Sequence, residues 1–329
     1  MPATNFQGTY HVDRYLTNYS MSWAQDQQNF VGRRASSLIP VTNQSNKYAE
    51  WDRGFFWRDE FARRPLGGRP SQISKKVNEG TYSAEEWALE DVIDDRQRAN
   101  VDAPLDLDEA SARTLTSKAM IKMDRLWAAA FFVPGTWTTL RVGTASTPGA
   151  NQFLQFDDAN SDPIGTMDAA KDSMFQLTGF MPNTLVLGAS VRTTLRSHPD
   201  IADRIKYVGV GLADEVKLQE LFDIPNVMTA RGLYNAAAEG AADDFEYIVD
   251  GTSMWMGYIE PNPSLNSPTA VACFAWTGLI PGATNAMGGV IERGRDDRAK
   301  SDWIQDRMAF DLKAVATDLG VFFQSVVSA

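Results

Sequence analysis

The sequence contains very few of the side chains on which most enzyme chemistry depends. Its 329 residues include one cysteine, Cys273, and two histidines, His11 and His198. A single cysteine excludes an internal disulfide framework, and the apolar run at 270–276 predicts that this thiol is buried and inert. Three such residues, widely spaced, do not make a zinc site. A catalytic triad would need His198, which precedes Pro199 and is expected to be structural.

Recognisable nucleotide-binding and metal-binding motifs are also missing. The glycines at 209–211 and 288–294 match neither the dinucleotide fingerprint nor a phosphate loop with its lysine, and we expect 288–295 to be a loop at a strand edge. The acidic run at 157–162 resembles a calcium loop. However, Pro163 replaces the turn glycine and Ala169 replaces the bidentate glutamate. We therefore expect no cofactor, no metal site and no enzymatic activity.

Long apolar runs are absent as well. The longest, at 126–133, is far shorter than the roughly 20 residues that a membrane span requires. The first residues lack the basic and apolar regions of a signal peptide, so we expect synthesis in the cytoplasm and no contact with a membrane. The net charge is −11, and residues 99–329 carry the whole acidic excess. A surface of this charge disfavours general binding to nucleic acid.

What the chain does contain is an uneven charge pattern between residues 47 and 95. Residues 47–76 hold eight basic and four acidic side chains, whereas residues 79–95 hold seven acidic and no basic ones. The run at 63–70, Arg-Arg-Pro-Leu-Gly-Gly-Arg-Pro, is typical of a loop tip. We interpret 51–57 and 71–77 as strands beside this tip. The segment has too few apolar residues for a core, so it is predicted to be a long β-arm that lies on another surface.

Two capping-box patterns predict helix starts. The pattern at 83–86 predicts a short helix at 84–94, and the pattern at 106–109 opens the longest helix, at 107–132. Pro134 and the glycine after it end this helix. Its core face is predicted from apolar residues that step by three and four: Leu115, Ala119, Met123 and Leu126.

Elsewhere the patterns are shorter. Residues 1–46 are polar, and we interpret them as an extended arm that becomes ordered against a partner, with a short helix at 19–30; a floppy tail is the alternative. Residues 134–164 are expected to form a loop. Beyond them we expect helices at 166–179, 189–197, 200–206 and 213–222, and strands at 183–188, 226–231, 246–250, 254–259, 269–277, 308–312 and 314–325. This uneven mixture predicts an α+β protein.

Two stretches resemble the HK97-type major capsid proteins of tailed phages. Residues 81–107, which begin Thr81-Tyr-Ser-Ala-Glu-Glu-Trp87, resemble the motif between the extended loop and the spine helix in one group of these proteins. Residues 183–199, which begin Asn183-Thr-Leu-Val-Leu-Gly188, resemble the strand that enters their axial domain. The resemblance runs in order from about residue 40 to the end of the chain.

This resemblance implies a fold and a function. It implies an N-terminal arm at 1–46, an extended loop at 47–82, a peripheral domain at 83–183 and 269–329 with the spine helix at 107–132, and an axial domain at 184–268. The chain would be a homo-oligomer that forms the hexamers and pentamers of an icosahedral head. That head would enclose double-stranded DNA without sequence-specific binding, so the expected location is the virion, after synthesis in the host cytoplasm. An arm of 46 residues is too short for a built-in scaffold, which implies a separate scaffolding protein; a portal is implied as well.

The arm is predicted to be an intersubunit contact. Its basic residues are Arg58, Arg63, Arg64, Arg69, Lys75 and Lys76. The candidate receiver on a neighbouring subunit is acidic: Glu85, Glu86, Glu90 and Asp94. The alternative is that the two limbs neutralise each other within one subunit. Some relatives crosslink subunits through a Lys–Asn bond; Lys75 and Lys76 lie on the arm, but the sequence identifies no partner asparagine and no catalytic glutamate.

Two other function classes stay open. An encapsulin-like compartment would have the same fold with a host enzyme as its cargo, so the contents of purified particles would discriminate. A soluble enzyme with an unrecognised acidic site would instead form a small oligomer at all concentrations.

Overall fold

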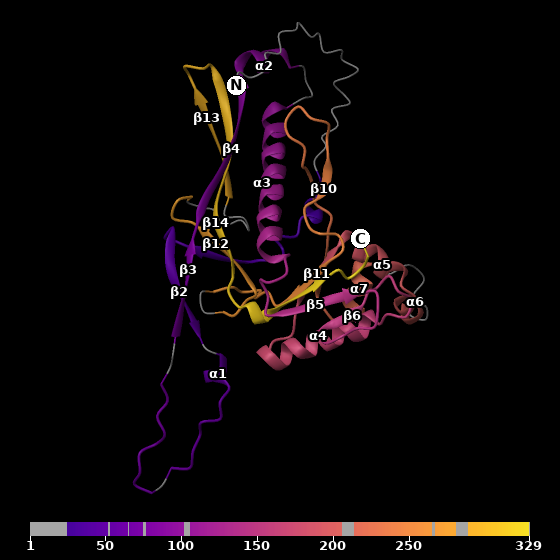
Figure 1. Ribbon diagram of the computed structural model, residues 1–329. Coiled ribbons are helices and arrows are strands. Elements are labelled where there is room, and N and C mark those ends of the chain that lie inside the picture. The colour runs from indigo at the N-terminus through magenta and orange to yellow at the C-terminus, as the bar shows by residue number, and fades with distance from the viewer. Residues whose placement is uncertain are drawn as a thin grey trace.

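The computed structural model describes residues 25–51, 53–64, 66–74, 77–101, 106–205, 214–264, 267–280 and 289–328. Helices and strands are unevenly grouped in it, which confirms the predicted α+β class. Figure 1 shows a long helix beside a tall sheet, a second sheet surrounded by short helices, and an arm that projects from the lower end. The α-helices are α1 (Arg53–Phe56), α2 (Asp95–Asn100), α3 (Leu107–Phe131), α4 (Pro163–Thr178), α5 (Ala189–Ser197), α6 (Pro199–Ile205) and α7 (Glu215–Phe222).

The tall sheet lies along α3. Its strands are β1 (Ser37–Val41), β12 (Val271–Trp276), β14 (Ser301–Ala314), β13 (Gly289–Asp296) and β4 (Glu85–Asp94). The long strand β14 pairs with β13 on one edge and with β4 on the other, both antiparallel, while β12 continues the ladder at its C-terminal end. The strand β1 is parallel to β12.

The second sheet has six strands from distant parts of the sequence. In spatial order they are β6 (Gln152–Leu154), β5 (Thr139–Thr144), β15 (Gly320–Gln324), β11 (Met254–Gly257), β7 (Thr184–Gly188) and β8 (Asn226–Ala230). The helices α4, α5 and α7 pack against it. The domain boundary predicted at residue 184 therefore passes through this sheet, because β5, β6 and β15 lie beside strands of the proposed axial domain.

The remaining elements are two hairpins and two short 3-10 helices. The base of the arm is the antiparallel pair β2 (Ser45–Trp51) and β3 (Val77–Ser83), and the other hairpin is β9 (Leu233–Asn235) with β10 (Phe245–Tyr247). The 3-10 helices are Gln27–Asn29 and Thr317–Leu319.

The helix α3 occupies the range predicted for the long helix and contacts both sheets. Asp106 caps it, because its side chain accepts the backbone N–H groups of Asp108 and Glu109. Near its start, Leu115 packs with Ile93 and Ile304 of the tall sheet. Near its end, the ring of Trp127 lies edge-on to that of Trp255, with centroids 5.9 Å apart, in the core of the six-stranded sheet.

The helix predicted at 84–94 is wrong: these residues form the strand β4, paired with β14 along its whole length. Pairing buries Ile93 and partly buries Trp87 against α3, which a solvated helix would not do. The capping box instead lies at Asp94, where the side chain accepts the N–H of Arg96 and Gln97 reaches back, and it opens α2. Tertiary pairing has overridden the local signal.

Several shorter predictions are also corrected. Residues 53–56 are the helix α1 rather than part of a strand, and the described residues up to Ser74 have no strand before β3. The expected loop at 134–164 contains β5 and β6, and the expected edge loop at 288–295 is mostly the strand β13. The two strands predicted near the C-terminal end are real but differently bounded, since β14 begins already at Ser301.

The N-terminal arm is only partly a separate arm. Most of the short helix predicted at 19–30 lies outside the described residues, and the structure has only a 3-10 turn within the rest of it. Further on, Val31 and Ala35 are fully buried in the large core and β1 joins the tall sheet. This part of the segment is thus ordered within its own subunit, because its apolar residues find a core there.

Candidate assembly surfaces

The arm between β2 and β3 exposes side chains that a monomer has no reason to expose. Phe61 and Leu66 are fully exposed, and Ile73 is more than half exposed. Only the base of the arm touches the body: a Cβ added to Gly179, at the end of α4, would lie 2.6 Å from Cζ2 of Trp57. Beyond that point the arm projects away from both sheets (Figure 1). A segment of this kind gains its apolar burial only from another molecule.

The predicted basic residues of the arm are exposed and mostly unengaged. Arg64 donates from Nε to the carbonyl of Gly68 at 2.6 Å. Among the described residues, no ion pair joins Arg58, Arg63, Arg64 or Arg69 to a carboxylate. Lys75 and Lys76 lie outside the described residues. The arm therefore keeps its positive charge available.

The candidate acidic receiver lies on β4, and only part of it is free. Glu86 pairs with Arg307 at 2.7 Å, and Arg307 also contacts Glu292 on β13. These carboxylates, Glu86 first, raise the pKa of the Arg307 guanidinium. Asp94 caps α2. Glu85 and Glu90 are exposed and have no ion-pair partner among the described residues.

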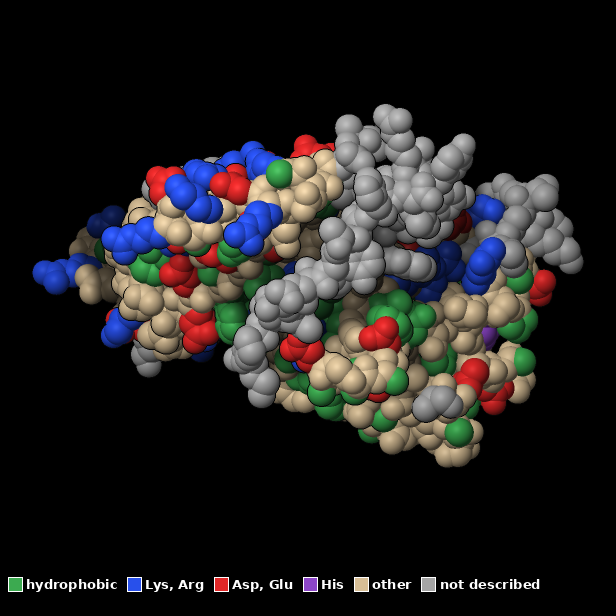
Figure 2. All heavy atoms as spheres, turned by 90° about the horizontal axis from the view of Figure 1, so that it is seen from above, with side chains coloured by type: hydrophobic (Ala, Val, Ile, Leu, Met, Phe, Trp, Pro, Cys, Tyr) green, Lys and Arg blue, Asp and Glu red, His purple; other side chains and the backbone are tan. Residues whose placement is uncertain are grey.

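A network of ion pairs that sequence reasoning missed ties together the upper end of the tall sheet. Arg295 contacts Asp95 at 2.8 Å and Asp302 at 2.9 Å, and Arg98 contacts Asp302 and Asp108 at the start of α3. The hydrogen bond from Arg295 lowers the pKa of Asp95. Figure 2 shows basic and acidic side chains interleaved over this end. No sequence signal could find it, since the partners lie about 200 residues apart.

The buried carboxylate of Asp124 fastens the N-terminal segment to α3. Its two oxygens accept the backbone N–H groups of Val31 at 3.0 Å and Gly32 at 2.7 Å. Glycine is needed at position 32, because a Cβ there would lie 2.8 Å from Oδ1 of Asp124 and 3.0 Å from Cβ of Trp127. Burial raises the pKa of Asp124 to about 6, although the two N–H groups act in the opposite direction.

The variant Asp124→Asn is expected to lower the free energy of unfolding of unassembled subunits by about 1–2 kcal/mol, because the amide can accept only one of the two N–H groups. Its pH dependence has a definite sign. The folded-state pKa lies above the ordinary value of 3.8, so stability from protonation is complete below about pH 4 and is lost as the pH rises through 6. Denaturant titrations at pH 4.5 and 7.5 should thus give a wider gap between wild type and variant at the lower pH. A gap that stays constant would show that Asp124 does not titrate in this range.

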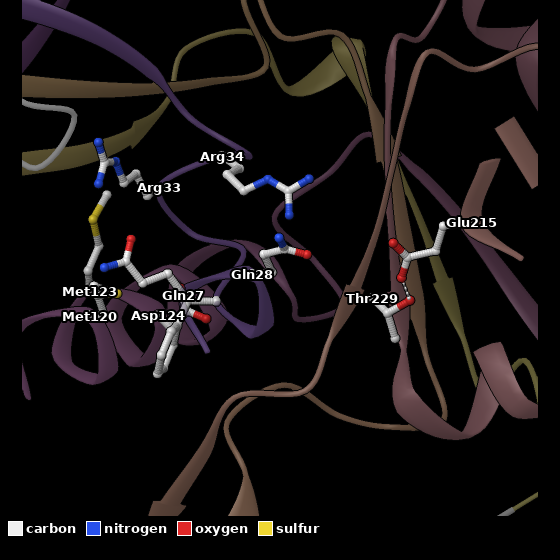
Figure 3. A pocket seen from close by; sticks show the side chains of 10 residues that line it. Gln27, Gln28, Arg33, Arg34, Met120, Met123, Asp124, Glu215 and Thr229 are labelled. Atoms are coloured by element: carbon white, nitrogen blue, oxygen red, sulfur yellow. Dashed lines mark hydrogen bonds between the residues drawn. The ribbon is translucent and has the colours of Figure 1, made fainter. Parts of the chain in front are cut away.

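A cavity of about 620 Å³ lies beside this fastening. Figure 3 shows Met120, Met123 and Asp124 of α3 on one side and Glu215 and Thr229 on the other. Gln28 and Arg34 lie between them (Figure 3). Both carboxylates are engaged, Asp124 with the backbone and Glu215 with the hydroxyl of Thr229 at 2.6 Å. The cavity is a seam between the N-terminal segment, α3 and the six-stranded sheet.

The residues that could have carried enzyme chemistry serve the fold. His198 is buried; its Nδ1 accepts the N–H of Asp200, and its Nε2 lies 3.0 Å from the hydroxyl of Ser161. Cys273 is buried in the tall sheet, and burial raises the pKa of its thiol to about 12. Within the described ranges, no cluster of histidine, cysteine or acidic residues could hold a metal ion. None of the described helices is long and apolar enough to cross a membrane.

The predicted core face of α3 is largely turned inward. Leu115, Ala119 and Met123 are buried, whereas Leu126 is only partly buried, against the cluster that contains Met308. The buried positions that the prediction omitted include Trp127 and Phe131. They extend the same helical spacing toward the second sheet.

Known proteins with a similar sequence or structure agree on this architecture. The chain is 25% identical over 251 residues to the major capsid protein of Burkholderia phage BcepMu, a match that covers 75% of this chain and 76% of that protein. The crystal structure of a phage-related protein from Bordetella bronchiseptica RB50 is similar with a TM-score of 0.69 and 18% identity, covering 93% of this chain and 95% of that one. The capsid structure of cyanophage P-SCSP1u gives a TM-score of 0.61 at 10% identity, with 93% and 91% covered. No family model matches the chain. At these identities the structural likenesses establish the fold.

Proposed function

We propose that this chain, a tailed-phage major capsid protein with the HK97-type fold, assembles through its arm into the hexamers and pentamers of an icosahedral head. The head encloses double-stranded DNA without reading its sequence, and a separate scaffolding protein and a portal take part in its assembly. The observation that carries this proposal is the arm, which exposes Phe61 and Leu66 completely and has no core of its own. Hiding one such side chain is worth about 1.5–3 kcal/mol.

The arm acts as a clasp on a neighbouring subunit. Its free arginines lie far from the upper half of the chain's own β4 (Figure 1), which supports contact between subunits over neutralisation within one. Exposed ion pairs contribute only about 0–1 kcal/mol each, so no single pair decides assembly. Repeated around a ring, they set the register and the choice of partner.

The role is structural, and we propose that it involves no catalysis. Of the residues with catalytic potential, the thiol of Cys273 is buried and His198 is committed to hydrogen bonds within the fold. The acidic residues of β4 are engaged in ion pairs and a helix cap, or lie exposed on a strand edge.

Negative-stain microscopy of the purified chain tests this function. Closed shells, rings of five or six, or sheets are expected, because a chain with an uncovered arm buries it by assembly. A small oligomer at every concentration would instead support an enzyme. Nucleic acid in particles from infected cells supports a phage head, whereas a packaged host enzyme would indicate an encapsulin-like compartment.

A further inference from the structure

The strand β4 has one open edge. Its other edge pairs with β14 over all ten residues, from Asp94 opposite Ser301 to Glu85 opposite Phe310. Within the described ranges, no strand pairs with the open edge. A ten-residue strand is about 33 Å long, and its unpaired N–H and C=O groups form a template for another strand.

The side chains along β4 add two further means of recognition. Leu89 is 44% exposed and Val92 is 52% exposed, which is unusual for apolar residues in the middle of a strand. Glu85 and Glu90 keep their charge available, unlike Glu86, which Arg307 neutralises. The open edge is therefore both apolar and acidic.

The arm carries the complementary set. Its described residues from Trp57 to Ser74 are extended or turn-like and form no strand, so their backbone groups lack a ladder partner. The same stretch exposes Phe61 and Ile73 and presents basic side chains without ion pairs. Backbone, apolar surface and charge thus each match β4.

We propose that one limb of the arm of a second copy adds as a strand to the open edge of β4. This inference rests on the proposed function and names the surface that the arm grips. Main-chain hydrogen bonds give the contact its strength, and alternate side chains select the register. Val92 and Leu89 receive apolar residues of the limb, while Glu85 and Glu90 receive its arginines.

The occupant is a second copy because the geometry excludes the chain's own arm. Figure 1 shows the tip of the arm at the lower end of the molecule and most of β4 at the upper end. The contact joins two different surfaces of identical subunits, so it is head-to-tail. A head-to-tail contact generates a closed ring when its rotation divides a full turn, as pentamers and hexamers require.

Hydrogen exchange of the unmodified protein tests the proposal without any risk of misfolding. Exchange is compared by mass spectrometry between assembled particles and unassembled subunits. We expect the peptides that cover residues 57–74 and 85–94 to exchange at least about tenfold more slowly in particles, because new main-chain hydrogen bonds protect both. Protection of the arm without protection of β4 would overturn the inference.

Cysteine crosslinking between copies supplies the partner. The native Cys273 is buried, so introduced cysteines react alone. Subunits with Ile73→Cys or Phe61→Cys are mixed with subunits that carry Val92→Cys, assembled and oxidised. Crosslinked dimers are expected from these mixtures and not when Val92→Cys is replaced by Val216→Cys, an exposed position on α7.

The outcomes separate the two ideas. Particles that assemble without a crosslink between arm and β4, or with equal crosslinking to position 216, contradict strand addition and leave the proposed function standing. Protection of β4 without any crosslink to the arm would show that a different segment covers the edge, which also overturns the inference. A wild-type chain that forms no particles or rings contradicts both.

Discussion

Replacing Leu115 by aspartate is expected to abolish soluble, assembly-competent protein. Leu115 is 3% exposed and packs between Ile93 of β4 and Ile304 of β14, at the place where α3 meets the tall sheet. A buried charge without a partner costs about 3–5 kcal/mol, which is much of the 5–15 kcal/mol that stabilises a typical domain. Soluble yield after expression and particle yield by microscopy measure the effect.

The same helix offers matched controls for this substitution. Thr114→Asp puts the same charge one residue earlier, on an exposed position, and should leave yield nearly unchanged. Leu126→Asp should have an intermediate effect, because Leu126 is only partly buried. If Leu115→Asp were soluble and assembled normally, the assignment of this face of α3 to the core would be wrong.

Reversing two charges at the tip of the arm is expected to have the largest effect on assembly that leaves the fold intact. Arg63 and Arg64 are exposed, and no ion pair in the described part of the chain engages them. Arg63→Glu with Arg64→Glu turns two attractions into repulsions at every contact, for a loss of about 1–3 kcal/mol per subunit. The critical concentration for assembly should rise roughly tenfold or more.

Salt and a conservative variant make this test specific. At about 1 M salt the Debye length falls to ~3 Å, so wild type and variant should become more alike. The pair Arg63→Lys and Arg64→Lys keeps the charge and should assemble nearly as wild type. Light scattering over a concentration series measures all three proteins. Unchanged assembly with unchanged salt dependence would refute the electrostatic clasp.

Mechanically, α3 is the element through which the arm and the six-stranded sheet are linked. It packs against β4, which continues from the arm strand β3, and through Trp127 it packs against Trp255 of β11. The fastening of Val31 and Gly32 by Asp124 adds the N-terminal segment to the same helix. A pull on the arm is therefore carried to the rest of the subunit by packed side chains rather than by a flexible linker.

The candidate surfaces were only partly predictable. A stretch of arginines around Pro-Leu-Gly-Gly marks an exposed tip in any context, so the arm could be identified from its composition. Which acidic residues stay free could not be inferred, because the partners of Glu86 and Asp95, Arg307 and Arg295, come from strands some 200 residues later. The role of Asp124 was equally invisible, since its partners are backbone groups of a remote segment.

The sequence by itself determined the elements whose signals are local. The helix α3 begins at the cap that Asp106 provides and follows its apolar spacing, because helix hydrogen bonds and caps join residues a few positions apart. Only the tertiary structure decided β4. Its first residues carry a helix-capping pattern, but pairing with β14 and burial of Ile93 against α3 outweigh it. A strand takes its partner from elsewhere in the chain, so its existence depends on contacts that no local pattern contains.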